Sequence, residues 1–155
     1  MGKKSSLLDK FKQGKPGAKR LTLKCISDPK EIAKIEKFLE DVNLVARLDD
    51  GAFYRLLVAT TEAVNNAIVH GNKSDPEKQV CVNCDVVNSS IYVYVKDEGL
   101  GFDPDSIPNP TEKDNLMLPS GRGVFLMRTL MDDVRFHFTE EGTVVEMILD
   151  YSKLR

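Results

Sequence analysis

The sequence predicts one α+β domain built as a two-layer sandwich, in which a mixed, mostly antiparallel sheet carries helices on one face. The chain has 155 residues, 41% of them hydrophobic, which suits one core and is short for two domains. Several of its β-prone segments follow one another through short turns, and short turns join antiparallel strands. Its helical segments are apolar along one side, so each helix needs a sheet or another helix to cover that side.

Composition and charge exclude several classes of protein. The formal net charge of -2 lacks the basic excess of a general nucleic-acid binder, so no direct contact with nucleic acid is expected. No apolar run is long enough to span a membrane and no signal segment opens the chain, which predicts a cytoplasmic protein without membrane contact. The three cysteines fit free thiols, and Cys81 and Cys84 would face opposite sides of one strand.

The amino-terminal segment is basic. Residues 1–20 contain seven Lys or Arg and one Asp, so the rest of the chain is acidic. We predict that residues 1–19 form a flexible, solvated tail and that residues 20–155 form the domain. An electrostatic contact between this tail and an anionic partner is the alternative.

The first half of the domain predicts a strand and two helices. Residues 20–26 alternate and are β-prone. Residues 27–42 follow as a helix with Asp28 as its N-cap. Residues 48–72 have apolar positions at helical spacing, with Asp49 or Asp50 as the cap and Gly71 as the stop, so they predict a long central helix.

The second half predicts two hairpins separated by a long loop and a helix. Residues 79–87 and 91–97 alternate as strands around a short turn. Residues 99–123 are rich in proline and show no sustained periodicity, which is typical of a lid or a disordered loop. Residues 123–134 predict a helix and residues 134–150 a final hairpin.

One edge of the central helix is polar. Glu62, Asn66 and His70 follow one another at four-residue steps. Each helical residue turns by about 100°, so these positions drift by only about 40° per step and share one edge. Taken alone, this edge is equally explained as a solvated helix face, and His70 as a structural residue at the helix end.

A carboxylate stands at the end of a predicted strand. Asp97 is followed by Gly99 and Gly101, whose bare backbone would let a flat ligand approach closely. A carboxylate accepts hydrogen bonds, so an exocyclic amine such as that of adenine is a natural partner. A hairpin turn would explain the two glycines as well.

A third polar segment precedes the predicted helix at residues 123–134. It consists of Ser120, Gly121, Arg122 and Gly123. Free N–H groups and the helix dipole favour an anion there, and phosphate is the natural candidate. An ordinary helix N-cap is the alternative reading of this segment.

Four segments in this order resemble the GHKL ATP-binding superfamily and, within it, the anti-sigma-factor serine/threonine kinases. The segments are "EAVNNAIVHGN" (62–72), "DEGLGF" (97–102), "SGRGVFLMRTLMDDV" (120–134) and "EGTVVEM" (141–147). With the order of elements, the resemblance covers about residues 20–150. It implies a Bergerat-type fold, a histidine-kinase-like ATPase domain that binds ATP and Mg²⁺.

The resemblance also implies roles for single residues. Asn66 would ligate Mg²⁺, and Glu62 would be the general base that takes a proton from the attacking hydroxyl. Asp97 would read the adenine amine, with Thr143 supporting this end of the site. Backbone would approach the base at Gly99 and Gly101, and the phosphates at Ser120, Gly121, Arg122 and Gly123. Residues 103–119 would form the ATP lid.

The implied activity is transfer of the γ-phosphoryl group of ATP to a serine or threonine of an anti-anti-sigma-factor protein, together with or in place of sequestration of a sigma factor. Such a protein regulates transcription, and members of the family often form homodimers. Two alternatives stay open. One is a nucleotide-gated protein-binding module without kinase activity, and the other is a detached histidine-kinase catalytic domain.

Overall fold

The computed structural model describes residues 6–99 and 119–152, with side chains from residue 121 onward in the second range. The elements in chain order are α1 (Leu7–Gln13), β1 (Lys19–Ile26), a 3-10 turn (Pro29–Ile32), α2 (Ala33–Ala46), α3 (Asp50–Asn66), a π turn (Ala67–Gly71), β2 (Gln79–Val87), β3 (Ser90–Lys96), α4 (Pro119–Leu130), β4 (Asp133–Thr139) and β5 (Gly142–Asp150). Within these ranges no helix has the length and apolar character needed to cross a membrane.

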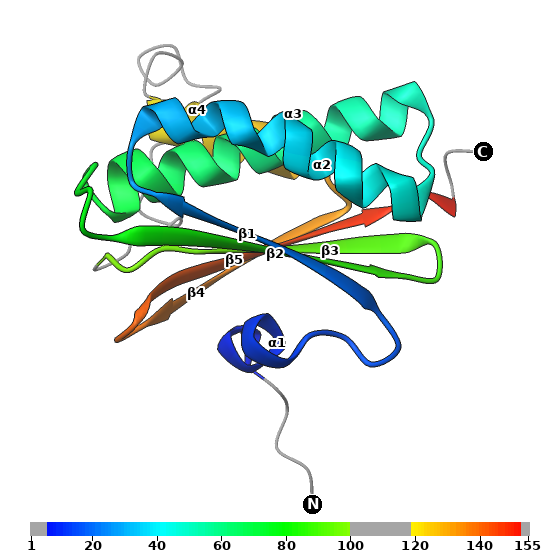
Figure 1. Cartoon of the computed structure of the whole chain (residues 1–155), viewed down its shortest axis with the longest axis horizontal. Helices are drawn as coiled ribbons and strands as arrows, with labels where there is room; N and C mark the ends of the chain where they lie inside the picture. The colour runs from blue at the N-terminus through cyan, green and yellow to red at the C-terminus, as the bar shows by residue number, and fades with distance from the viewer. Residues whose placement is uncertain (1–5, 100–118, 153–155) are drawn as a thin grey trace, which may run out of the picture.

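Within the described residues, the sheet has five strands in the order β1-β2-β3-β5-β4. All four pairings are antiparallel. Helices α2, α3 and α4 lie together on one face of this sheet (Figure 1). The predicted α+β fold of two layers is therefore confirmed.

The long central helix lies within the predicted residues 48–72, but its α-helical part, α3, ends at Asn66. Asp49 caps α3, because its Oδ1 accepts a hydrogen bond from the N–H of Ala52 at 2.8 Å. After Asn66 the helix continues as the π turn, and the N–H of Asn72 donates to the carbonyl of Ala67 at 2.8 Å. This bond spans five residues, as in a π-helix, and π turns are frequent at functional sites.

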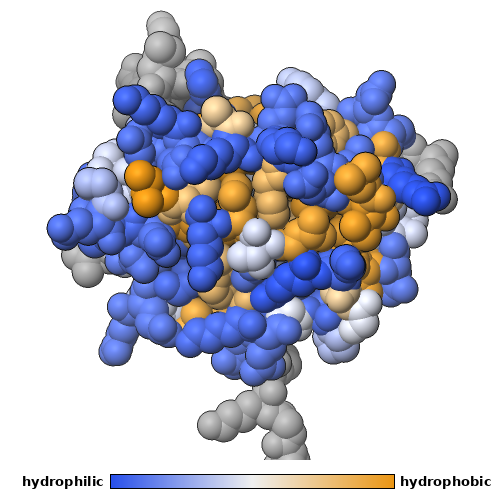
Figure 2. Space-filling view, in the orientation of Figure 1, coloured by the Kyte–Doolittle hydropathy of each residue, from blue (hydrophilic) through white to orange (hydrophobic). Residues whose placement is uncertain are grey.

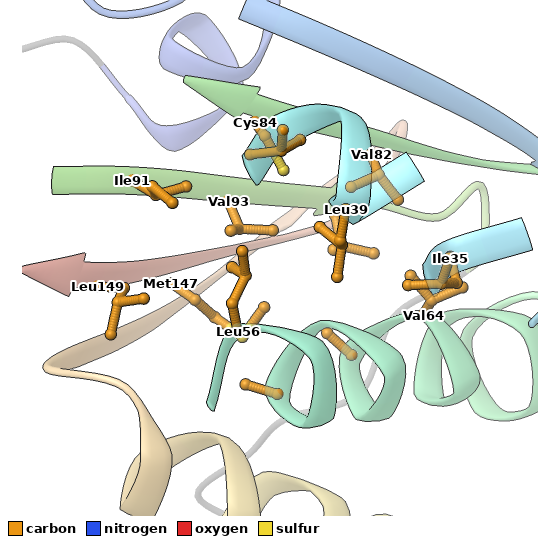
Figure 3. Close-up of a cluster of buried hydrophobic side chains, with 14 of the residues drawn as sticks. Ile35, Leu39, Leu56, Val64, Val82, Cys84, Ile91, Val93, Met147 and Leu149 are labelled. Atoms are coloured by element: carbon orange, nitrogen blue, oxygen red, sulfur yellow. The ribbon is translucent and has the colours of Figure 1, made fainter. Parts of the chain in front are cut away.

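The main core lies between the sheet and these helices. Figure 3 shows Ile35 and Leu39 of α2 and Leu56 and Val64 of α3 directed toward side chains of the strands. All four side chains are fully buried. Burying each contributes roughly 1.5–3 kcal/mol, so the helical layer is held to the sheet chiefly by apolar contact.

The edge of this core is visible beside β1. Figure 2 shows apolar side chains gathered between α2 and the strands beneath it, with hydrophilic residues above and below. β1 is an edge strand, and its Leu21 and Leu23 pack against the core while staying partly exposed.

The three cysteines are free thiols, as predicted. Cys84 belongs to the main core, whereas Cys81, on the opposite face of β2, packs beside Phe11. Burial raises the pKa of all three thiols, and it raises that of Cys25 to about 11. These thiols are therefore poor nucleophiles.

The prediction of a flexible tail is wrong for residues 6–18. Ser6 caps the short helix α1 by accepting a hydrogen bond from the N–H of Asp9. Helix α1 lies on the face of the sheet opposite the other helices (Figure 1). Phe11 is 9% exposed and forms a second apolar cluster there with Tyr94 and Val144. Seven residues are too few for a stable isolated helix, so α1 depends on this contact.

An ion pair on the sheet holds the end of α1. Arg20 donates from Nε to Oδ1 of Asp85 at 2.6 Å and from Nη2 to Oδ2 at 3.0 Å, and the Asp85 side chain is fully buried. The same guanidinium donates to the carbonyls of Lys10 and Phe11, and Asn83 also donates to the carbonyl of Phe11. The carbonyl of Lys10 also accepts from the N–H of Gly14, so the added donors chiefly satisfy the carbonyl of Phe11 at the helix C-terminus.

Candidate functional site

Asp97 stands at the end of β3 with one carboxylate oxygen fixed. The residue is 3% exposed, and its Oδ1 accepts hydrogen bonds from the N–H groups of Gly99 and Thr143, each at 3.0 Å. Its own N–H donates to the carbonyl of Thr143 at 3.1 Å. In the described parts of the chain, Oδ2 has no hydrogen-bond partner, so this oxygen is available to a ligand.

Three glycines close around Asp97. A Cβ on Gly71 would lie 2.1 Å from Oδ2 of Asp97, and a Cβ on Gly142 would lie 1.9 Å from its carbonyl oxygen. Gly142 also has a φ of 127°, which side chains rarely adopt. A Cβ on Gly99 would lie 1.6 Å from the carbonyl oxygen of Gly71. The carboxylate is thus confined by backbone that leaves no room for side chains.

Burial raises the pKa of Asp97 above its ordinary value. The hydrogen bonds from Thr143 and Gly99 act in the opposite direction, because they favour the charged form. Acid therefore removes this acceptor at a higher pH than it would for an exposed aspartate.

A narrow pocket opens beside Asp97. Asp97 and Asn66 are its polar residues, and the walls are apolar: Ala63, Ala67, Val95, Met127, Phe136 and Val145. Its cavity volume is about 10 Å³, room for about one water molecule. The pocket therefore combines a fixed carboxylate with apolar walls, and a ring could enter only if wall side chains move apart.

The polar helix edge meets the start of α4. Glu62 is half-buried and Asn66 is 3% exposed. A Cβ on Gly123 would lie 3.0 Å from Nδ2 of Asn66 and 3.1 Å from Oε2 of Glu62. A carboxylate, an amide and bare backbone of α4 are therefore in contact range of one another.

Two buried polar atoms at this site have no hydrogen-bond partner within the described residues. They are Nδ2 of Asn66 and Oγ1 of Thr143. Leaving such an atom unpaired costs about 1–3 kcal/mol, so a ligand that supplied partners would gain affinity. These polar groups suit a nucleotide, because the amide of Asn66 and the carboxylate of Asp97 line an apolar pocket, and Thr143 is hydrogen-bonded to Asp97.

The same residues suit Mg²⁺ held together with phosphates. No cluster of three or more His, Cys, Asp or Glu side chains among residues 6–99 and 121–152 could hold a metal ion by itself. Mg²⁺ typically takes one or two protein oxygens plus oxygens of a bound phosphate. The amide oxygen of Asn66 offers one such ligand, and the carboxylate of Glu62 lies close by, at the same glycine of α4.

The predicted phosphate segment lies inside α4 rather than before it. Pro119 opens the helix, which suits proline because the first position needs no N–H. Ser120 and Gly121 therefore belong to its first turn, Arg122 is exposed, and Gly123 is buried against α3. Gly101 and most of the predicted lid lie outside the described residues.

His70 leaves the polar edge that the sequence predicts. Glu62 and Asn66 belong to α3, but residues 67–71 form the π turn, which holds more residues per turn. A step of four residues therefore no longer returns to the same edge, and His70 does not line the pocket. Burial, and then the charge of Lys73, lower the pKa of His70.

Sequence reasoning missed several residues around Asp97. Gly71 and Gly142 are predictable as a helix stop and a turn, but not as contacts of a carboxylate. Met127 and Phe136 look like ordinary core positions, although they line the pocket. Asn72 gives no signal in the sequence, yet it is fully buried next to this site.

The chain is similar in sequence to known proteins. Residues 25–149 match the family described as the histidine kinase-like ATPase domain. The serine-protein kinase RsbW of Listeria innocua is 26% identical over 132 residues, covering 81% of this chain and 84% of that protein. The anti-sigma F factor of Bacillus subtilis is 32% identical over 117 residues, covering 72% and 80%.

Solved structures show the same fold. The crystal structure of the RsbU and RsbW domains of Rv1364c from Mycobacterium tuberculosis superposes with a TM-score of 0.62 at 15% identity. The match covers 84% of this chain and 32% of that larger chain.

Proposed function

Since the chain belongs to the histidine kinase-like ATPase domain family, we propose that it binds ATP with Mg²⁺ and acts as a protein serine/threonine kinase of the anti-sigma-factor type. One observation carries the proposal: the fixed carboxylate of Asp97 shares an apolar pocket with Asn66, which in turn lies against Gly123 of α4. A base, a sugar and phosphates could follow one another along that line.

Adenine would bind at the Asp97 end. Its exocyclic amine would donate to the free Oδ2, and the hydroxyl of Thr143 would gain a partner. The apolar walls would contact both faces of the ring, and the flexible side chain of Met127 could move to admit it. Ring entry would then widen the cavity that now holds about one water molecule.

The phosphates would bind at the Glu62 end, beside Gly123 and the first turn of α4. Asn66 would contribute its amide oxygen as a metal ligand, and Gly121 and Gly123 would bring backbone close to the phosphates. Bound Mg²⁺ would supply positive charge that offsets the charge of the transferred group. Glu62 would accept the proton of the attacking hydroxyl, because a half-buried carboxylate is reachable from solvent.

The proposed partners are supported by the names of the relatives. Relatives carry the names serine-protein kinase and anti-sigma F factor, so the phosphoacceptor would be a serine or threonine of an anti-anti-sigma-factor protein. The same chain could sequester a sigma factor and so regulate transcription. A cytoplasmic location and a homodimer agree with this role.

The decisive test is phosphoryl transfer with purified protein. Incubation with Mg²⁺, γ-labelled ATP and a candidate anti-anti-sigma factor should label the partner's serine with the wild type and not with Glu62→Ala. Glu36→Ala, which removes an exposed acid on α2, is the matched control and should label normally. Both Glu variants should still bind ATP, whereas Asn66→Ala should also weaken Mg²⁺-dependent binding.

Other outcomes point elsewhere. Equal label with Glu62→Ala would overturn the role of Glu62 as base. ATP binding without any label would favour the nucleotide-gated binding module. Label on histidine of a separate phosphoacceptor domain would favour a detached histidine-kinase catalytic domain.

A further inference from the structure

Asn72 is a buried amide that joins several segments around Asp97. The residue is fully buried, and its Nδ2 donates to Oγ of Ser27 at 2.7 Å and to the carbonyl of Gln79 at 3.0 Å. Its Oδ1 accepts a hydrogen bond from the N–H of Glu98 at 2.7 Å. One side chain thus connects the end of the π turn to the ends of β1, β2 and β3.

The bond to Glu98 acts on the residue next to the carboxylate. Glu98 lies between Asp97 and Gly99, and the N–H of Gly99 donates to Oδ1 of Asp97. Fixing the Glu98 peptide therefore fixes the start of the turn that holds this oxygen. The side chain of Glu98 accepts from the N–H of Gln79 at 2.9 Å, so the same peptide is tied to β2 on a second side.

The neighbouring residue acts on the other carboxylate oxygen. Gly71 faces Oδ2 of Asp97, and its carbonyl packs directly against Gly99. Gly71 therefore confines Asp97 by close contact, and Asn72 holds the following peptide, that of Glu98, by a hydrogen bond. If the Asn72 bond were lost, the turn after β3 could move away from Gly71 and carry the carboxylate with it.

We propose that Asn72 is a positioning residue for base recognition, which sets the place of the Asp97 carboxylate through its hydrogen bond to the Glu98 peptide. The inference rests on the proposed nucleotide function and assigns a specificity-determining role to a residue outside the pocket lining. Its consequence is that Asn72 controls discrimination between adenine, which has an exocyclic amine, and hypoxanthine, which has a carbonyl at that place.

The test compares the affinities for ATP and ITP. The wild type should bind ATP more tightly than ITP. Asn72→Ala should lower the ratio of ATP affinity to ITP affinity about five-fold, the effect of roughly one lost hydrogen bond. Asn83→Ala is the matched control, because Asn83 is 6% exposed and also joins two groups, Thr22 and the carbonyl of Phe11, on the other face of the sheet. This control should lose stability and keep the ratio.

A second control separates the hydrogen bonds that the Asn72 side chain donates from the one that it accepts. Ser27→Ala removes one acceptor of the Asn72 Nδ2 and leaves the bond to Glu98 in place. It should lower the melting temperature and keep the ATP preference. An Asn72→Ala protein that loses stability but keeps the ATP-to-ITP ratio of the wild type would overturn the inference.

Two further measurements keep the test decisive. If Asn72→Ala does not fold, replacing the Glu98 amide by an ester removes only the N–H that donates to Asn72, and the ratio should narrow equally. Hydrogen exchange of the Gly99 amide should speed up in Asn72→Ala and not in Asn83→Ala, a readout that needs no nucleotide. Unchanged exchange would refute the positioning role alone, whereas a wild type that binds no ATP would refute the proposed function and the specificity role with it.

Discussion

Replacing Gly71 by alanine tests how tightly the backbone confines Asp97. The added methyl carbon would lie 2.1 Å from Oδ2 and 2.5 Å from Cγ, inside the 3.0 Å limit of real contacts. The carboxylate cannot turn away freely, because Gly99 and Thr143 both donate to its Oδ1. Moving it would break at least one hydrogen bond to a charged group, which contributes about 1.5–3 kcal/mol.

We therefore expect Gly71→Ala to lower the free energy of unfolding by about 2–3 kcal/mol, measured by urea titration. ATP affinity, measured by calorimetry, should fall about ten-fold or more, since the displaced carboxylate no longer meets the amine.

Gly51→Ala is the matched control for this substitution. A Cβ on Gly51 in α3 would meet only Asp49, at 3.6 Å. Alanine favours a helix over glycine by up to about 1 kcal/mol, so this variant should be as stable as the wild type or more so. If Gly71→Ala instead unfolds at the same urea concentration as the wild type and binds ATP equally, Asp97 is not confined by residue 71.

Three further predictions concern charge and thiols. Because burial raises the pKa of Asp97 in the folded state, the charged carboxylate destabilises the fold above that pKa, and this destabilisation is relieved as the pH falls through the pKa. ATP affinity should weaken over the same pH range, because the protonated carboxyl no longer accepts the hydrogen bond of the amine. Asp97→Asn should abolish this pH dependence in a binding titration. Asp85→Ala should cost about 3 kcal/mol in urea unfolding because Arg20 loses a buried partner, whereas Asp133→Ala, which removes an exposed pair, should cost less than about 1 kcal/mol. Iodoacetamide at about pH 8 should label Cys84 only in the unfolded protein, and mass spectrometry showing rapid native labelling would contradict its burial.

Local patterns were enough to predict most of the helices and strands and their order along the chain. The caps, turns and apolar spacing each depend on residues that are near one another in the chain, and Asp49 and Gly71 mark the ends of the central helix as expected. Alternation in residues 79–87 also places Cys81 and Cys84 on opposite faces.

Features that depend on distant contacts could not be predicted in this way. Helix α1 forms because Phe11 and Arg20 contact residues more than sixty positions later in the chain. The basic composition of this segment gives no sign of those contacts. The π turn rotates His70 away from its expected edge, although nothing in the local sequence distinguishes it from a continuing α-helix. The closeness of Gly71, Gly99 and Gly142 to Asp97 likewise appears only when the chain is folded.

Helix α1 also decides where this protein can be shortened. The family match begins at residue 25, so cutting the chain there would remove Arg20 along with α1. Asp85 on β2 would then lose Arg20 as its ion-pair partner, and the apolar surface of Tyr94 and Val144 would face water. A shortened protein that is expected to stay monodisperse in solution therefore keeps the chain from residue 6 onward. The folding unit begins before the first strand, at α1.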